Sequence, residues 1–126
     1  VSTDKVSAKE ITFSGIKTVD GGGTNTITGT ALANEFTLVD SNKVSANGIT
    51  FKSIASVDGL AGDNEIIGFE NQQWQLSGTT NAITGNDIDF TSIVKVTATN
   101  GTVIGTDNAD AFLLSTGLNS DNQVTA

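Results

Sequence analysis

The chain has 126 residues and a formal net charge of −8, and it contains no Pro, Cys, Met, His, Tyr or Arg. Without an imidazole or a thiolate it has no ordinary acid–base catalyst or sulfur nucleophile. The acidic balance argues against nucleic acid as a partner, because binding a polyanion depends on neutralising phosphates with Lys and Arg. No apolar run reaches the roughly 20 residues that cross a bilayer. We therefore expect a protein that is not an enzyme, with no catalytic residues and no membrane insertion.

The same phrase begins at three places in the chain. It reads KVSAKEITFSGIKTVDG from Lys5, KVSANGITFKSIASVDG from Lys43 and AITGNDIDFTSIVKVTA from Ala82. The copies recur every 38 or 39 residues. A fixed period in this range is typical of repeat architectures, in which no single repeat can bury its own apolar face. We expect one domain over 1–126, with repeats at 5–42, 43–81 and 82–121 and a fourth copy starting at 122–126. The chain would then start and stop within a repeat.

The second repeat predicts four short strands in chain order, at Val44–Ala46, Gly48–Val57, Glu65–Gly68 and Trp74–Ser77. Apolar residues in these segments are spaced two apart, which is the alternation of a strand and not the stripe of a helix. Gly residues at the segment ends agree with turns between strands. The long segment is expected to bend near Ser53. The class predicted by the pattern is all-β.

Aligned copies predict columns of like side chains. If each repeat forms two solenoid coils of about 20 residues, like residues lie above one another along a β-solenoid. The expected core ladders are Phe13, Phe51 and Phe90, and Phe36, Trp74 and Phe112. Because Trp74 occupies the register of two Phe residues, a core position is favoured for it over an exposed platform for a sugar ring. A third apolar register contains Ile27, Ile66 and Ile104.

An Asn or Asp residue precedes each copy by the same interval. Asp4, Asn42, Asn81 and Asn122 all lie two residues before the Val or Ile that opens a repeat. Such side chains bond the backbone of their own turn and tolerate left-handed conformations. The pattern predicts a turn that recurs, with its Asx side chains stacked.

The combination GITFKSIASVDG, DNEIIG and QWQL resembles the repeats of large secreted bacterial surface proteins, the filamentous haemagglutinin-like adhesins. The resemblance covers essentially the whole chain. It implies a right-handed parallel β-helix that serves as a stalk or spacer, is exported from the cell and lies at the bacterial surface. The segment VTATNGTVIG departs from the more Gly- and Asp-rich repeats, because its turn has lost a residue or two.

Calcium is the only cofactor that the sequence suggests. In the repeats-in-toxin nonapeptide, turn carbonyls and an Asp carboxylate bind the ion. Here Asn25 and Asn64 occupy the position of that Asp, and an amide lacks its charge. Asp20, Asp58 and Asp63 remain candidates for an ion held at a turn, against the simpler interpretation of acidic turns.

One acidic pair invites comparison with a glycosidase. Asp87 and Asp89 flank Ile88 and would point to the same side of a strand, about 7 Å apart, which is the separation used by inverting enzymes. The other copies have Gly48 and Thr50, or Glu10 and Thr12, at these two positions. We therefore expect no catalysis from the pair.

The leading functional hypothesis is a non-enzymatic stalk or spacer of an extracellular bacterial adhesin or fibre protein. Unpaired strands at the ends of a solenoid can associate with neighbouring repeats of the same or identical chains. A subunit of a self-assembling extracellular filament is therefore the first alternative. A module that binds a host or matrix glycan, or calcium, is the second.

Overall fold

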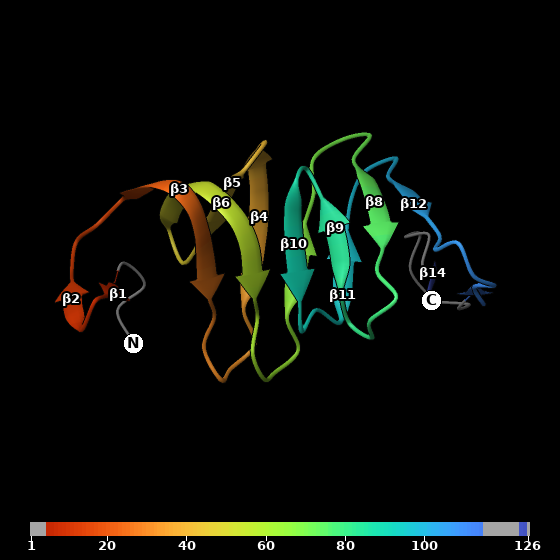
Figure 1. Ribbon diagram of the computed structural model, residues 1–126, viewed down its shortest axis with the longest axis horizontal. Helices are drawn as coiled ribbons and strands as arrows, with labels where there is room; N and C mark the ends of the chain where they lie inside the picture. Colours follow the sequence, from red (N-terminus) through yellow and green to blue (C-terminus); the bar gives the residue numbers. More distant parts are fainter. Residues whose placement is uncertain (1–4, 115–123, 126) are drawn as a thin grey trace.

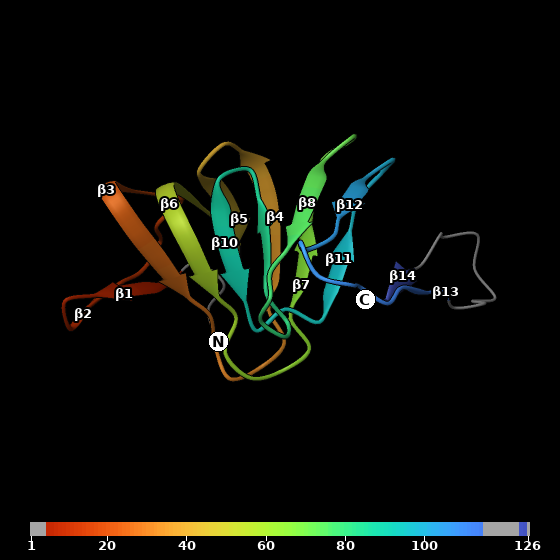
Figure 2. The same cartoon turned by 45° about the vertical axis from the view of Figure 1, so that its right-hand side comes forward.

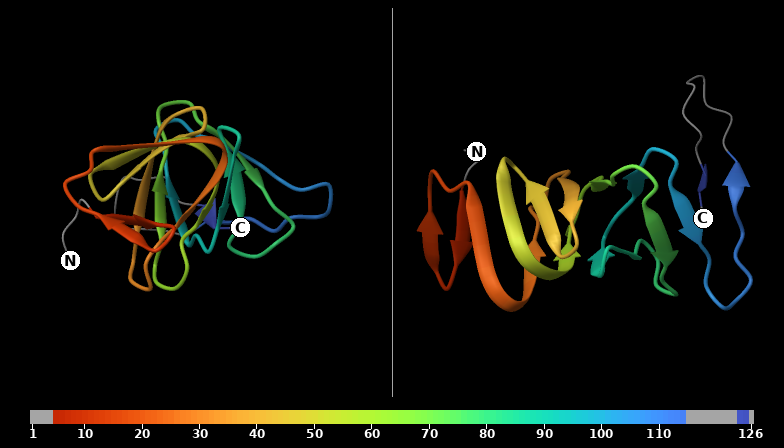
Figure 3. Two further views of the ribbon diagram at one scale, coloured as in Figure 1. Left: turned by 60° about the vertical axis from the view of Figure 1, so that its left-hand side comes forward. Right: turned by 90° about the horizontal axis from the view of Figure 1, so that it is seen from above.

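The structure, a computed structural model, describes residues 5–114 and 124–125. Its regular elements are all strands, which confirms the all-β class. Among the described residues, one sheet has the order β11-β7-β4-β5-β6-β10-β9-β8-β12, with β3 paired to β6. Figure 1 shows the strands following one another along the long axis, and the left view of Figure 3 shows them curling around the interior. The described part contains no helix of the length and apolar character needed to span a bilayer.

The strands are short, apart from β3 and β6. Their bounds are β1 (Val6–Ala8), β2 (Ile11–Phe13), β3 (Thr18–Thr28), β4 (Glu35–Asp40), β5 (Lys43–Ala46), β6 (Ile49–Asp58), β7 (Glu65–Ile67), β8 (Gln73–Leu76), β9 (Ile83–Gly85), β10 (Ile88–Thr91), β11 (Lys95–Thr97), β12 (Thr102–Ile104), β13 (Leu113–Leu114) and β14 (Val124–Thr125). In the second repeat, β5 to β8 lie within a residue or two of the strands predicted from the sequence. The expected bend occurs at Ser53, whose φ is 60°.

Two-residue turns join the strands that open each repeat. Lys9–Glu10 connects β1 to β2, Asn47–Gly48 connects β5 to β6, and Asn86–Asp87 connects β9 to β10, with positive φ at both residues each time. This is the geometry of a type I′ turn, which reverses the chain and matches the twist of the strands it joins. All three pairs are accordingly antiparallel. Each sequence repeat therefore begins with a β-hairpin.

Parallel pairing connects strands of different repeats. Glu35 of β4 lies beside Glu65 of β7, which in turn lies beside Lys95 of β11. Each step along this ladder equals the 30 residues that separate Asn34 from Asn64 in the adjoining loops. A second ladder joins β3 to β6 and β6 to β10, and a third joins β8 to β12. Figure 2 shows these neighbouring strands side by side. The parallel ladders link one repeat to the next.

The predicted right-handed parallel β-helix is wrong. Antiparallel hairpins interrupt the parallel ladders, and the whole is a mixed, curled sheet. The predicted two coils of about 20 residues per repeat are also wrong, because parallel partners such as Glu35 and Glu65 are separated by the longer step of 30 residues. Since this step is shorter than the sequence period, residues that match in sequence lie at different places around the turn.

Like residues consequently do not stack in the predicted columns. Phe13 lies opposite Val6, Phe51 lies between partners on β3 and β5, and Phe90 lies between partners on β6 and β9. The six ladder residues divide by burial: Phe36, Trp74 and Phe90 are buried, Phe51 is partly buried against the core, and Phe13 and Phe112 are exposed.

The third repeat also has a different register from the one predicted. Val103 lies opposite Trp74, just as Ile66 lies opposite Phe36. Val103, and not Ile104, therefore corresponds to Ile66. The offset of one residue follows from the shortened turn that the sequence shows before β12.

Trp74 occupies the core position expected for it, and its bulk is matched by a missing side chain. It is 1% exposed and meets Phe90 edge-on, with ring centroids 6.3 Å apart. A Cβ at Gly85 would lie 2.5 Å from the indole ring. In the equivalent hairpin Thr37 lies opposite Ser45, and the residue that corresponds to Gly85 in the sequence repeat is Ala46. The chain thus combines the larger aromatic residue with Gly and the smaller one with Ala.

This size match predicts strong coupling between the two positions. Gly85→Ala alone should lower the free energy of unfolding by about 1–3 kcal/mol, because it overpacks the core. Adding Trp74→Phe should restore at least about 1 kcal/mol of this loss, since the double variant reproduces the Phe36 and Ala46 pair. Urea unfolding of the two single variants and the double variant measures the coupling. Additive effects would show that the two side chains do not share one space.

Candidate functional site

The most structured polar feature is a set of loops that share a Gly and, five residues later, an Asn or Asp. The loops are GTALAN from Gly29, GLAGDN from Gly59 and GTDNAD from Gly105. In each loop the Asx side chain folds back onto its own backbone, as in the Asx turns that Asn and Asp favour. Asn34 Oδ1 accepts hydrogen bonds from the amide and hydroxyl of Thr30, and Asp110 Oδ2 accepts from the amide of Thr106 at 2.8 Å.

Asn64 joins its own loop to the Gly29 loop and to the segment that follows β10, and we call this set of contacts the Asn64 clasp. Its Oδ1 accepts from the backbone amide of Asn34 at 2.9 Å and from Asn34 Nδ2 at 2.8 Å. Its Nδ2 donates to the carbonyls of Leu60, in its own loop, and of Ser92, in the next turn of the chain. The side chain is 0% exposed. A buried amide is stable only with such partners, because each unmet bond costs about 1–3 kcal/mol.

The amide chemistry explains why Asn stands where a calcium-binding Asp would stand. Asn64 both donates and accepts within the clasp, and a carboxylate could only accept. Gly59 lets the side chain return so closely, since a Cβ there would lie 2.6 Å from Asn64 Nδ2. Sequence reasoning noticed Asn64 only as a missing carboxylate and overlooked Asn34. The signal that would have found both is the shared Gly-to-Asn spacing.

The three calcium candidates lie at different places. Asp20, on β3, receives a hydrogen bond from Ser53 Oγ at 3.3 Å. Asp58, at the end of β6, accepts from the Leu60 amide and from Ser92 Oγ, both at 2.9 Å. Asp63 is exposed in the loop before β7. Across the described residues, no group of three or more His, Cys, Asp or Glu side chains could hold a metal ion.

The acidic pair considered for glycoside cleavage is divided between two structural roles. Asp87 is the second residue of the β9–β10 turn and receives a hydrogen bond from Ser41 Oγ at 3.1 Å. Asp89 lies on β10 and receives one from Thr84 Oγ1 at 2.7 Å. The sequence pattern had suggested that the two share one strand face. In the structure Asp87 lies in a turn and only Asp89 lies on a strand.

Asn42 and Asn81 both have left-handed backbones, with φ of 53° and 58°. Asn42 Nδ2 donates across the fold to the Asp87 carbonyl, and the carbonyl of each Asn accepts from an Ile amide. These are turn-forming roles, as the recurring position predicted. Asp4 and Asn122 lie outside the described residues, as does most of the expected fourth copy.

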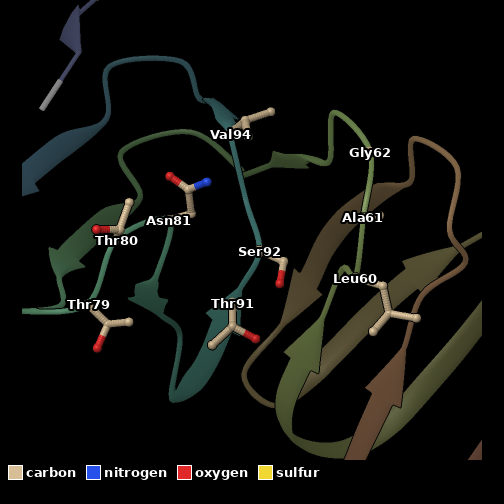
Figure 4. A pocket seen from close by; sticks show the side chains of 9 residues that line it. All are labelled: Leu60, Ala61, Gly62, Thr79, Thr80, Asn81, Thr91, Ser92 and Val94. Carbon is tan, nitrogen blue, oxygen red and sulfur yellow. The ribbon is translucent and has the colours of Figure 1, made fainter.

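A shallow hollow of about 510 Å³ lies beside the Asn64 clasp, between the loop at 60–62 and the segments at 79–81 and 91–94. Figure 4 shows hydroxyls of Thr79, Thr80, Thr91 and Ser92 around it, together with the Asn81 amide. Leu60 and Val94 add apolar surface. The lining carries no ionisable side chain, so the hollow can hydrogen-bond a neutral, hydroxyl-rich molecule but offers no acid or base.

Two carboxylates near the loops are held in their charged form. Hydrogen bonds from the Leu60 amide and the Ser92 hydroxyl lower the pKa of Asp58 below its ordinary value of 3.8. A hydrogen bond from Thr97, with a smaller contribution from Lys95, lowers the pKa of Glu65 below 4.5. Lys95 Nζ lies 3.1 Å from Glu65 Oε1. Both groups connect β-strands or loops of neighbouring turns.

Comparison of the chain with known protein families, curated proteins and solved structures found no match. The resemblance to adhesin repeats thus stays a prediction from the sequence.

Folding lowers the pKa values of Asp58 and Glu65. The stability that these two carboxylates provide is therefore present above their unfolded pKa values, and it is lost as the pH falls through their lower pKa values in the folded protein. We expect the free energy of unfolding to decrease as the pH drops from about 5 towards 3. Asp58→Asn should flatten this decrease, since it removes one of the titrating groups. Urea titrations at several pH values measure it, with Asp63→Asn as the matched loop control. An unchanged profile in Asp58→Asn would contradict the assignment.

Proposed function

We propose that the protein is a structural spacer, a module that holds flanking parts of a larger assembly at a fixed distance. The supporting observation is the set of parallel ladders between repeats, β4 to β7 to β11 and β3 to β6 to β10. Repeats that share a hydrogen-bonded sheet are joined along the long axis by the backbone bonds between their paired strands. The Asn64 clasp adds side-chain bonds across the same junctions.

The setting proposed for this spacer is a bacterial surface adhesin or fibre protein outside the cell. It rests on the sequence resemblance, and on a composition without the residues that usually carry catalysis. The glycan alternative has one favourable observation, the hydroxyl-lined hollow beside Ser92. A glycan-array signal that Thr80→Val abolishes would favour that alternative, because the change removes a hydroxyl that lines the hollow and keeps the side-chain shape.

Single-molecule pulling tests the spacer role directly. With handles attached at Lys5 and Asp110, the protein should extend in a discrete unfolding event and not by gradual lengthening. Asn64→Ala should lower the unfolding force, because it removes bonds to two neighbouring loops. Asn108→Ala is the matched control, since Asn108 is exposed and, among the described residues, its side chain bonds no neighbouring loop.

Gradual extension of the unmodified protein at low force would contradict the spacer role. Equal unfolding forces for the Asn64→Ala variant and the unmodified protein would show that the clasp carries no load.

A further inference from the structure

Apolar residues at one end of the sheet are exposed although their counterparts in the middle are buried. Val103 of β12 corresponds to Ile66 of β7, as the pairing with β8 and β4 shows. Val103 is 46% exposed and Ile66 is 0% exposed. The cause is a missing neighbour: β7 is flanked by β4 and β11, whereas in the described part of the chain β12 pairs with β8 alone.

The other end of the sheet shows the same contrast. Phe13 lies opposite Val6 in the β1–β2 hairpin, as Phe90 lies opposite Ile83 in the β9–β10 hairpin. Phe13 is 40% exposed and Phe90 is 1% exposed. β10 has a second neighbour, β6, while β2 has β1 as its one partner among the described strands.

We propose that these two ends bind each other, so that a second copy of the chain docks head to tail. The edge formed by β11 and β12 of one copy would meet β2 and β3 of the next. The parallel ladders within the chain show which residues of the two copies would pair. Ile66 pairs with Val96 inside the chain, and the corresponding contact joins Val103 to Val19 of the second copy.

The neighbouring contact follows in the same way. Phe90 pairs with Val57 inside the chain, so Phe13 of the second copy lies beside Val96. Gly68 donates its amide to the Thr97 carbonyl within the chain at 2.8 Å. The equivalent bond runs from Gly105 to the Asp20 carbonyl of the second copy. The interface thus continues one that the molecule already contains.

The direction of docking follows from the strand register and not from charge. Lys95 on β11 offsets Asp107 at one edge, and Asp20 on β3 and Glu10 offset part of the Lys charge at the other. Because the contact is heterologous, it leads to open chains of copies.

One residue weakens this contact, and it yields the sharpest test. Asp110 corresponds to Asn34, because each lies five residues after the Gly that opens its loop. Asn25 corresponds to Asn64, because the Nδ2 of each donates to a Ser carbonyl at 2.9 Å. In the docked pair Asp110 would face Asn25 Oδ1 of the second copy. The Asn34 amide donates at that place, but a carboxylate cannot. Two facing acceptors therefore oppose docking.

One strand must also give way. β14 pairs with β13 as β5 pairs with β4, so β14 of one copy and β1 of the next claim the same place beside β2. Docking displaces one of them. Association should accordingly be slow compared with simple collision.

Sedimentation velocity over a concentration series tests the proposal with the full chain. Asp110→Asn should tighten association about tenfold, by restoring the amide donor. In the Asp110→Asn background, Phe13→Lys or Val103→Lys should each abolish it. Val39→Lys is the matched control, because Val39 is a strand residue with 47% exposure away from both edges. Circular dichroism confirms that each variant is folded.

Mixing supplies the decisive readout. The Phe13→Lys variant keeps an intact β12 edge and the Val103→Lys variant keeps an intact β2 edge, so the mixture should form a dimer that does not grow further. An Asp110→Asn protein that stays monomeric at its solubility limit overturns the proposal. So does a mixture without dimers. Either result leaves the spacer role untouched, because that role depends on contacts within one chain.

Discussion

The buried amide of Asn64 is the interaction on which the arrangement of the loops depends. It bonds to the loop before it, through Asn34, to its own loop, and to the strand end after it, through the Ser92 carbonyl. A polar side chain with no exposure is tolerated only when its bonds are met, so the three segments have one mutual register. That register is the one in which β4, β7 and β11 pair in parallel.

Burial follows from the same register. The parallel ladders bring Ile66 beside Phe36 and Val57 beside Phe90, so unlike apolar residues from different repeats fill one interior. A repeat alone could not bury these residues. Where the ladder runs out, the equivalent Val103 and Phe13 remain exposed. The ends of the sheet are thus consequences of the same interaction that builds the middle.

Some of this fold could be predicted from the sequence. The strands of the second repeat, the bend at Ser53 and the core position of Trp74 follow from alternation and from register. The topology could not be predicted in this way, because an alternating pattern shows which residues of a strand face inward and does not show which strands are neighbours in the sheet. The overlooked signal was Asn47–Gly48, whose type I′ preference predicts a hairpin and excludes a continuous parallel coil. Asn86–Asp87 repeats that signal.

The polar loops were harder to predict for a different reason. Asn34 and Asn64 are 30 residues apart, whereas like residues in the sequence recur at the longer period of the repeat. Loop partners at another spacing cannot emerge from such an alignment. The identity of the residue carried information instead, since an amide in place of a carboxylate suits a site that must donate as well as accept.

The central claim is that β4, β7 and β11 pair in parallel at the spacing of 30 residues that also separates Asn34 from Asn64. Because the chain contains no Cys, engineered pairs of cysteines test it cleanly. Glu35→Cys with Glu65→Cys places two thiols on directly paired positions and should form a disulfide quickly under mild oxidation. Glu35→Cys with Gln73→Cys, which joins positions that match in the sequence repeat, should stay reduced. Rapid bond formation in the second pair, with none in the first, would contradict the account.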